Sequence, residues 1–335
     1  MRSAMWTGGH DFEIQESQPL DPGPGEIRIN VHGCGVCGTD LHVVQGLLGE
    51  IEPPLILGHE YAGTIDAKGD GVDHLSVGDA VTCIPAGRCE MCRNCLAGMP
   101  DGSCLFEKPT GGFTEQLVIP MTKVLPVPAG VDLDVATLAE PLTCCVRAMD
   151  VAQVQTGDTA VIVGAGPIGL MLLQIAIHSG ISKTIVSEIN PRRRQLAGRL
   201  GADVTVDPTK ESLSDAVQEA TNGEGVDIAF EVAAVPAALA ECIELVKDRG
   251  RVVLVGAHST TAQLAINLSS FHVRQLSLVT ANGGPWTFKR AVAWLGQLEL
   301  SPIISHRFDL ADTGKAFDLA KAGGLVKALV GPHLA

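Results

Sequence analysis

The sequence predicts an α/β protein with two domains, one rich in β-strands and one built on a parallel sheet. Up to about residue 150, short segments of alternating polar and apolar residues are separated by Gly/Pro turns. Beyond that point strand-like and helix-like segments alternate, and a last apolar segment at 326–330 resembles a strand that returns to the first domain. We therefore expect one domain from 1–148 together with 283–335, and a second from 149–282.

The β-rich domain is predicted from individual strands. Residues 26–32 alternate polar and apolar side chains, as a half-buried strand does. The same reasoning predicts strands at 60–67, 80–84 and 114–119. Turns are indicated by Pro-Gly-Pro-Gly at 22–25 and by Pro-Pro at 53–54.

The second domain is predicted from a regular alternation of elements. Its expected strands are residues 160–163, 184–188, 202–206, 226–232, 251–255 and 276–281. Helical segments lie between them, which predicts a parallel sheet flanked by helices. A helix at 142–151 leads into this domain. After it we expect a helix at 286–298, a strand at 305–308 and a helix that ends near 323.

Composition excludes several functional classes. The chain of 335 residues carries a net charge of −14 and a single Tyr, which disfavours a nucleic-acid or anionic membrane surface. No apolar run approaches the roughly 18 residues of a membrane helix, and the N-terminus lacks a signal core. We expect a cytoplasmic protein whose partner is a small molecule, with no nucleic acid and no membrane.

A glycine-rich segment predicts a dinucleotide site. The strand at 160–163 is followed by Gly164, Gly166, Pro167, Ile168 and Gly169, the pattern Gly-x-Gly-x-x-Gly at the start of a helix. Such a loop lets the backbone approach a pyrophosphate at the helix N-terminus.

A carboxylate follows at the expected distance. Glu188 ends the next predicted strand, where it would bind the ribose hydroxyls and repel a 2′-phosphate, so NAD is favoured over NADP. Arg193, with its neighbours Arg192 and Arg194, could instead bind that phosphate or form a solvated helix face.

Four clustered cysteines predict a structural zinc site. Cys89, Cys92, Cys95 and Cys104 can surround one tetrahedral ion with thiolates. Such a closed shell has no open position, so it would brace a lobe and take no part in a reaction. Free or oxidised thiols are the alternative.

A second constellation indicates a catalytic metal. Cys37, His59 and Glu60 supply the thiolate, imidazole and carboxylate from which catalytic zinc sites are built. Glu140 precedes the predicted helix at 142–151 and would lie at an interdomain cleft, although a helix N-terminal carboxylate is the alternative reading. Cys144 is a rival ligand or a small buried hydrophobe.

In order along the chain, these residues resemble the zinc-containing medium-chain dehydrogenase/reductase family, and its polyol and threonine dehydrogenase branch in particular. The matching segments are Gly-Val-Cys-Gly-Thr-Asp-Leu-His at 35–42, Gly-His-Glu-Tyr-Ala-Gly at 58–63, Val-Gly-Asp-Ala-Val at 77–81, the four cysteines, Glu-Pro-Leu at 140–142, the glycines at 164–169 and residues 300–308. The last cysteine gap holds eight residues, one more than is usual in the family.

The resemblance implies a fold and a set of metal ligands. The fold is a GroES-like, partly open β-barrel catalytic domain, completed by the C-terminal segment, beside a Rossmann domain. Cys37, His59 and Glu60 would bind a catalytic zinc, with Glu140 beside the metal or exchanging with its water. Asp40 would orient His59.

The resemblance also implies an activity. Thr39 would contact the substrate hydroxyl, and His42 would pass its proton out through the cofactor ribose. The expected reaction is NAD-linked oxidation of a secondary hydroxyl of a polyol, sugar derivative or hydroxy amino acid to the ketone. A homodimer or homotetramer through the strand at 276–281 is implied. The alternatives are an NADPH-preferring carbonyl reductase and a non-catalytic protein that binds zinc and a nucleotide.

Overall fold

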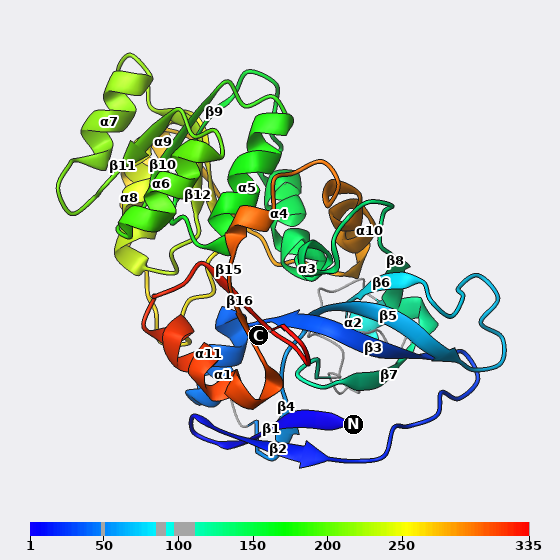
Figure 1. Cartoon of the computed structure of the whole chain (residues 1–335). Helices are drawn as coiled ribbons and strands as arrows, with labels where there is room; N and C mark the ends of the chain where they lie inside the picture. The colour runs from blue at the N-terminus through cyan, green and yellow to red at the C-terminus, as the bar shows by residue number, and fades with distance from the viewer. Residues whose placement is uncertain (48–50, 85–91, 97–110, 335) are drawn as a thin grey trace. The chain divides into compact units, whose positions relative to one another are not determined.

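The computed structural model describes residues 1–47, 51–84, 92–96 and 111–334, without the side chains of residues 94 and 95 (Figure 1). The chain divides into two compact units. Unit 1 comprises Met1–Thr143 with Gly284–Ala335, and unit 2 comprises Cys144–Gly283. The boundary falls within one helix, α4 (Ala139–Ala152). Among the described helices, none is both long and apolar enough to cross a membrane.

Unit 1 is built on two sheets in its described part. The strands are β1 (Arg2–Gly8), β2 (Asp11–Glu16), β3 (Glu26–Gly35), β4 (Leu55–Ile56), β5 (Glu60–Lys68), β6 (Ala80–Cys83), β7 (Gln116–Pro120), β8 (Val124–Pro126), β15 (Ile304–Phe308) and β16 (Lys327–Val330). The larger sheet has the order β15-β16-β3-β5-β6-β8, with β7 also paired to β3. The smaller sheet has the order β2-β1-β4.

Short helices accompany the strands of this unit, and its last strand, β16, lies inside the larger sheet between β15 and β3. The helices are α1 (Gly38–Val44), α2 (Arg93–Leu96), η1 (Met121–Lys123), α3 (Leu133–Ala136), α10 (Pro285–Trp294), η2 (Ser301–Ile303), η3 (Leu310–Asp312) and α11 (Thr313–Lys321). β16 pairs antiparallel with β3, with Leu329 opposite Gly35. The C-terminal segment therefore lies against the strand that leads into α1.

Strand β3 shows why the sequence pattern identifies this sheet. Ile27, Ile29 and Val31 are buried, whereas Asn30 between them is exposed, which is the period-two pattern of a strand with one solvated face. The strand extends to Gly35, three residues beyond the prediction, because its end is covered by β5 on one side and β16 on the other.

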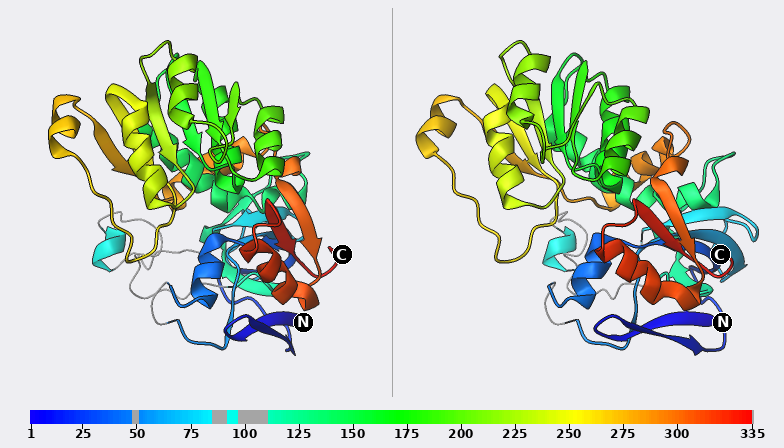
Figure 2. Two further views of the ribbon diagram at one scale, coloured as in Figure 1. Left: turned by 90° about the vertical axis from the view of Figure 1, so that its left-hand side faces the viewer. Right: turned by 60° about the vertical axis from the view of Figure 1, so that its left-hand side comes forward.

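Unit 2 is a six-stranded parallel sheet with helices on both faces (Figure 2). Its strands are β9 (Thr159–Val163), β10 (Lys183–Ser187), β11 (Val204–Val206), β12 (Val226–Glu231), β13 (Val246–Leu254) and β14 (Ser277–Thr280), and its helices are α5 (Pro167–His178), α6 (Pro191–Arg199), α7 (Leu213–Ala220), α8 (Pro236–Leu245) and α9 (Leu268–Val273). The order is β11-β10-β9-β12-β13-β14. This confirms the predicted doubly wound sheet. The strand order reverses between β9 and β12, where such sheets bind ligands at the carboxyl ends of their strands.

Several other element boundaries differ from the predictions, and two of these differences have a clear physical reason. Helix α4 begins at Ala139, three residues early, because Pro141 fits the first turn of a helix, where no amide hydrogen is needed. Strand β13 begins at Val246 and not at residue 251. It carries Arg249 at a φ of 61° and a register shift against β12, so its first half lacks the alternation that identifies a strand.

Candidate functional site

The N-terminus of α1 places Cys37 and Asp40. Cys37 caps the helix, and its backbone N–H donates to Asp40 Oδ2 at 3.0 Å. The other oxygen, Oδ1, accepts from the Gly58 N–H at 3.3 Å and lies 3.3 Å from His59 Nδ1. Asp40 is buried, so this one carboxylate connects the two segments that carry Cys37 and His59.

A tight turn delivers His59 and Glu60 to the same place. Gly58 has a φ of 92°, in the left-handed region that favours glycine, and a Cβ there would lie 2.7 Å from Cys34 Sγ. β5 starts two residues later. As a result, the candidate ligand atoms of Cys37, His59 and Glu60 all lie within 4.8 Å of one another. Three residues that the sequence singles out are thus brought together.

The neighbours of His59 raise the pKa of its imidazole. Desolvation lowers this pKa, but Asp40 and Cys37 more than offset the effect, and the pKa stands well above its usual range. The side chain keeps 22% of its surface exposed. The surroundings of His59 therefore favour positive charge at this position, which is also what a bound metal ion requires.

Lys327 is a member of the site that sequence reasoning missed. It lies on β16, and its Nζ donates to Glu60 Oε1 at 2.8 Å and Oε2 at 2.6 Å. A third bond goes to the Val36 carbonyl at 3.1 Å. Both Lys327 and Glu60 are buried. The available signal was one charged residue within the apolar segment 325–330, which is otherwise typical of a buried strand.

Glu140 lies in the first turn of α4 and is half-buried. Burial raises the pKa of its carboxyl group to about 7; Glu60 and Asp40 add to the rise, while His59 and Lys327 oppose it. Glu140 therefore shares the electrostatic environment of the other residues. It does not belong to the group whose ligand atoms lie within 4.8 Å, and Cys144 falls in unit 2. Metal binding by Glu140 stays a prediction.

The remaining predicted residues of unit 1 divide into two sets. Thr39 and His42 lie on α1, the first exposed and the second half-buried. Of the four clustered cysteines, only Cys92 has a described side chain, and it is buried. The predicted structural zinc site therefore lies largely outside the described residues.

The glycine loop of unit 2 has the geometry that the sequence predicts. Gly164 follows β9 with a φ of 106°, and a Cβ on Gly169 would lie 2.0 Å from the Gly164 carbonyl oxygen. Gly166 is the N-cap residue of α5, and no side chain caps the helix there. A Cβ on Gly166 would meet no atom within 4 Å. Pro167 and Ile168 begin the helix. The first amides of α5 are thus available to an anion from the open side of Gly166.

Glu188 lies directly after β10, and its side chain is buried against the loop. Oε2 accepts from the Ala165 N–H at 2.7 Å and Oε1 from the Asn190 N–H at 2.8 Å. Arg194 donates to the Glu188 carbonyl at 2.7 Å and pairs with Asp207 at 3.1 Å. Arg193 is half-buried at the start of α6. Arg194 is therefore engaged within unit 2, whereas the sequence left it open as a phosphate ligand.

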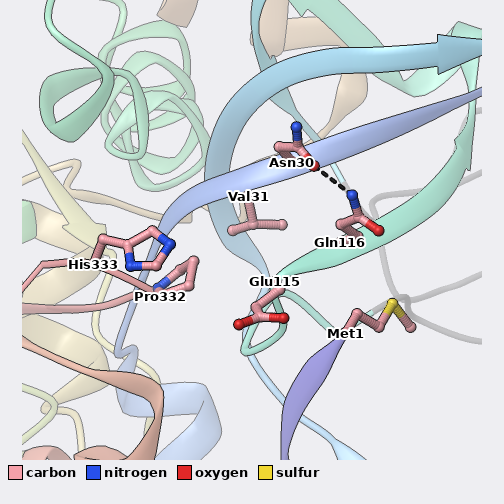
Figure 3. Close-up of a pocket in the computed structure, with 7 residues that line it drawn as sticks. All are labelled: Met1, Asn30, Val31, Glu115, Gln116, Pro332 and His333. Carbon is pink, nitrogen blue, oxygen red and sulfur yellow. Dashed lines mark hydrogen bonds between the residues drawn. The ribbon is translucent and has the colours of Figure 1, made fainter. Parts of the chain in front are cut away.

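One pocket of unit 1 contains none of these residues. It has a volume of about 480 Å³ and is lined by Met1, Asn30, Val31, Glu115, Gln116, Pro332 and His333. Figure 3 shows the Gln116 amide donating to Asn30, its partner on the neighbouring strand; the bond is 2.6 Å long. The Glu115 carboxylate accepts from Arg2 Nε at 2.7 Å. The Gln116 amide nitrogen and the Glu115 carboxylate are therefore paired within the protein, whereas the buried Gln116 Oε1 has no hydrogen-bond partner in the described structure.

Comparison with known proteins yields matches over nearly the whole chain. Residues 23–129 match the alcohol dehydrogenase GroES-like domain, and residues 167–297 match the zinc-binding dehydrogenase domain. The 2-dehydro-3-deoxy-L-galactonate 5-dehydrogenase of Pseudoalteromonas atlantica is 33% identical over 95% of this chain and 94% of its own. The L-threonine 3-dehydrogenase of Pyrococcus horikoshii is 34% identical over 94% of this chain and 93% of its own.

Solved structures agree with these matches. A zinc-binding dehydrogenase from Sinorhizobium meliloti, bound to NADP, superposes with a TM-score of 0.93 at 28% identity, over 99% of each chain. The agreement covers both units and confirms the expected combination of a GroES-like domain with a Rossmann domain.

Proposed function

This chain belongs to the zinc-containing medium-chain dehydrogenase/reductase family, and on that premise we propose that it oxidises a secondary hydroxyl to a ketone with zinc and NAD. One observation carries the proposal: Cys37, His59 and Glu60 present three different metal-binding groups within 4.8 Å of one another. Hydride leaves the substrate carbon for the nicotinamide, and a proton leaves its hydroxyl.

The donor set fits zinc. Zinc bonds to S, N and O ligands are roughly 2.0–2.3 Å long, so tetrahedral ligands lie about 3.3–3.8 Å apart. The three candidate atoms lie within 4.8 Å of one another, close to that spacing. Three protein ligands leave a fourth position for substrate. Zinc held there supplies a Lewis acid that lowers the pKa of an alcohol toward neutrality.

The residues around the three candidate metal ligands each have a proposed role in the reaction. Asp40 accepts a hydrogen bond from His59 Nδ1, which leaves Nε2 as the metal ligand, and it also accepts from the Cys37 N–H, which fixes the position of Cys37. Thr39 accepts the substrate proton as it gives up its own hydroxyl proton, and His42 passes that proton out through the cofactor ribose to solvent. Their assignment is supported by the family resemblance and by their place on α1, the helix that Cys37 caps.

NAD is the proposed cofactor. The pyrophosphate would bind the free amides at the start of α5, where Gly166 leaves open space. Glu188 uses one lone pair on each carboxylate oxygen for Ala165 and Asn190, so further lone pairs stay available to ribose hydroxyls. Its negative charge repels a 2′-phosphate.

The proposed substrate is a small polyol, sugar derivative or hydroxy amino acid. The names of the two curated relatives describe dehydrogenases of a sugar acid and of L-threonine, and this range supports the class without selecting one member. A panel of polyols, aldonates, threonine and simple secondary alcohols, each with NAD and NADP, would identify the substrate through the absorbance of reduced nicotinamide.

Removal of the thiolate tests the proposal. Cys37→Ser is expected to abolish turnover and to remove one zinc per chain while the far-ultraviolet spectrum is unchanged. Cys242→Ser is a matched control, because Cys242 is a buried cysteine in unit 2. Full turnover in Cys37→Ser, or a metal content equal to that of the control, would reject the site.

We also infer a homodimer or homotetramer. β14 is the edge strand of the six-stranded sheet, and its end residues are exposed, so a second copy could extend the sheet there. Light scattering coupled to size exclusion measures this state. A cytoplasmic location stays a prediction from the sequence.

A further inference from the structure

A buried carboxylate stands at the carboxyl end of β12, in unit 2. Glu231 is the last residue of this strand, and none of its surface is exposed. Its Oε1 accepts from the Val235 N–H at 3.2 Å, and its Oε2 lies 2.9 Å from His258 Nε2. Glutamate is almost never fully buried unless it is paired. In the described structure, the imidazole of His258 is the side chain that pairs with Glu231.

The loops that follow β9, β12 and β13 are in contact beside this carboxylate. A Cβ on Gly164, in the glycine loop after β9, would lie 3.0 Å from the Ala233 nitrogen. A Cβ on Gly256, after β13, would lie 2.6 Å from the Ala234 nitrogen and 2.9 Å from Glu231 Oε2. Ala234 has a φ of 58°, a strained conformation of the kind that is concentrated at functional sites. Glu231 therefore lies close to the point where the strand order reverses.

The other ring nitrogen of His258, Nδ1, is open to solvent. The side chain of His258 is 13% exposed. No atom of the described residues bonds Nδ1, yet Nδ1 is not enclosed by the protein. An ionised carboxylate only accepts hydrogen bonds, so Nε2 carries the hydrogen that faces Glu231. Nδ1 is therefore the atom of this pair that is left for a ligand.

The symmetry of the sheet relates His258 to Glu188. Each half of a doubly wound sheet of this kind can bind one mononucleotide. β10 and β13 hold equivalent places, each one strand away from the central pair of β9 and β12. Glu188 follows β10 and, in the proposed function, binds the ribose of the adenosine half. His258 follows β13, so its open nitrogen would face the ribose of the nicotinamide half.

We propose that His258 Nδ1 binds a hydroxyl of the nicotinamide ribose, and that Glu231 is a positioning residue that holds the imidazole for this contact. The inference rests on the proposed function, in which NAD binds at the start of α5. A hydroxyl group both donates and accepts, so it can bond Nδ1 whether or not that nitrogen carries a proton. Glu188 and His258 would then hold the two riboses of the cofactor, one in each half of the sheet.

Three nucleotides separate the parts of the cofactor. ADP lacks the nicotinamide ribose, ADP-ribose has this ribose without nicotinamide, and NADH has both groups. Titration calorimetry on the full-length protein measures the affinity for each. His258→Phe keeps a ring without nitrogen atoms, and it should bind ADP-ribose and NADH about tenfold more weakly, as expected for the loss of one hydrogen bond. Its affinity for ADP should equal that of the wild type.

A double-mutant cycle tests the role of Glu231. Glu231→Gln keeps groups that can bond Val235 and His258, but it offers an amino group beside the oxygen and no longer fixes which ring nitrogen donates. It should weaken ADP-ribose binding less than His258→Phe does. In the His258→Phe background it should have no further effect, because Glu231 acts through the imidazole. Additive losses would refute the positioning role.

Two further variants separate binding from structure. His272→Phe changes a histidine of the same unit, on α9 before the amino end of β14, and should leave all three affinities unchanged. If His258→Phe does not fold because it leaves a buried carboxylate unpaired, the double variant with Glu231→Gln removes that charge. Far-ultraviolet circular dichroism reports folding, and the double variant should show the same selective tenfold loss. Unfolding of the double variant as well would assign the pair to the fold and overturn the proposal.

The outcomes distinguish this inference from the proposed function. A wild type that binds none of the three nucleotides contradicts the proposed function. A wild type that binds them, with the affinity for ADP-ribose unchanged in His258→Phe, contradicts only the contact with the ribose. An equal loss of affinity for ADP also overturns the inference, because the substitution would then affect the adenosine half.

Discussion

Gly166 and Gly169 are three residues apart in one loop, yet their substitution by alanine should have different effects. Gly169→Ala should lower the stability of the fold, and Gly166→Ala should weaken cofactor binding. A Cβ on Gly169 would lie 2.0 Å from the Gly164 carbonyl oxygen, which is backbone and cannot rotate away. Helix α5 must then shift from β9. Overpacking of this kind costs roughly 1–3 kcal/mol, and a backbone obstacle argues for the upper part of that range.

Gly166→Ala should leave stability nearly unchanged. Gly166 has a φ of −66°, which alanine adopts freely, and its Cβ would meet no atom within 4 Å. The entropy gained by replacing glycine, about 0.4–1 kcal/mol, is opposed by the poorer helix capping of alanine. The net change is expected within about 0.5 kcal/mol. The new methyl group would nevertheless occupy the path of the pyrophosphate, so NADH should bind at least about tenfold more weakly.

Two assays separate these effects. Urea unfolding of the cofactor-free protein, followed by far-ultraviolet circular dichroism, measures stability, and the fluorescence of bound NADH measures affinity. Gly166→Ala serves as the matched control for the stability loss of Gly169→Ala. Unchanged unfolding of Gly169→Ala, or wild-type NADH affinity in Gly166→Ala, would refute the geometry assigned to this loop.

Two further predictions concern carboxylates. The pKa of Glu140 is raised to about 7 in the folded protein, so the folded state binds a proton more tightly than the unfolded chain does, and the free energy of unfolding falls as the pH rises from about 4.5 through 7. The urea midpoints of the metal-free protein at pH 5 and pH 8 should therefore differ less in Glu140→Gln than in the wild type. An equal difference would contradict this assignment. Glu188→Gln should lower the preference for NADH over NADPH by about tenfold, since the amide no longer repels a 2′-phosphate; dissociation constants for the two nucleotides measure this, and an unchanged ratio would count against a role of Glu188 in cofactor choice.

Much of the fold could be predicted because its elements are encoded locally. The alternation in residues 26–32 and the strand–glycine–helix order at 160–169 depend only on neighbours in the chain, and both appear in the structure as β3 and as β9 followed by α5. Boundaries were less predictable. The extra length of β3 and of β13 depends on partner strands that supply backbone pairing where the side-chain pattern has stopped.

The sequence by itself determined the chemistry of the candidate site. Thiolate, imidazole and carboxylate at Cys37, His59 and Glu60 are properties of the residues, and the turn at Gly58 and the cap at Cys37 orient them over a few residues. Only the tertiary structure decided what surrounds that group. Lys327 stands 267 residues from Glu60, and the two meet because β16 and β5 flank β3 in a register set by strand pairing. Register depends on contacts summed along whole strands, so no local pattern announces which buried lysine will face which carboxylate.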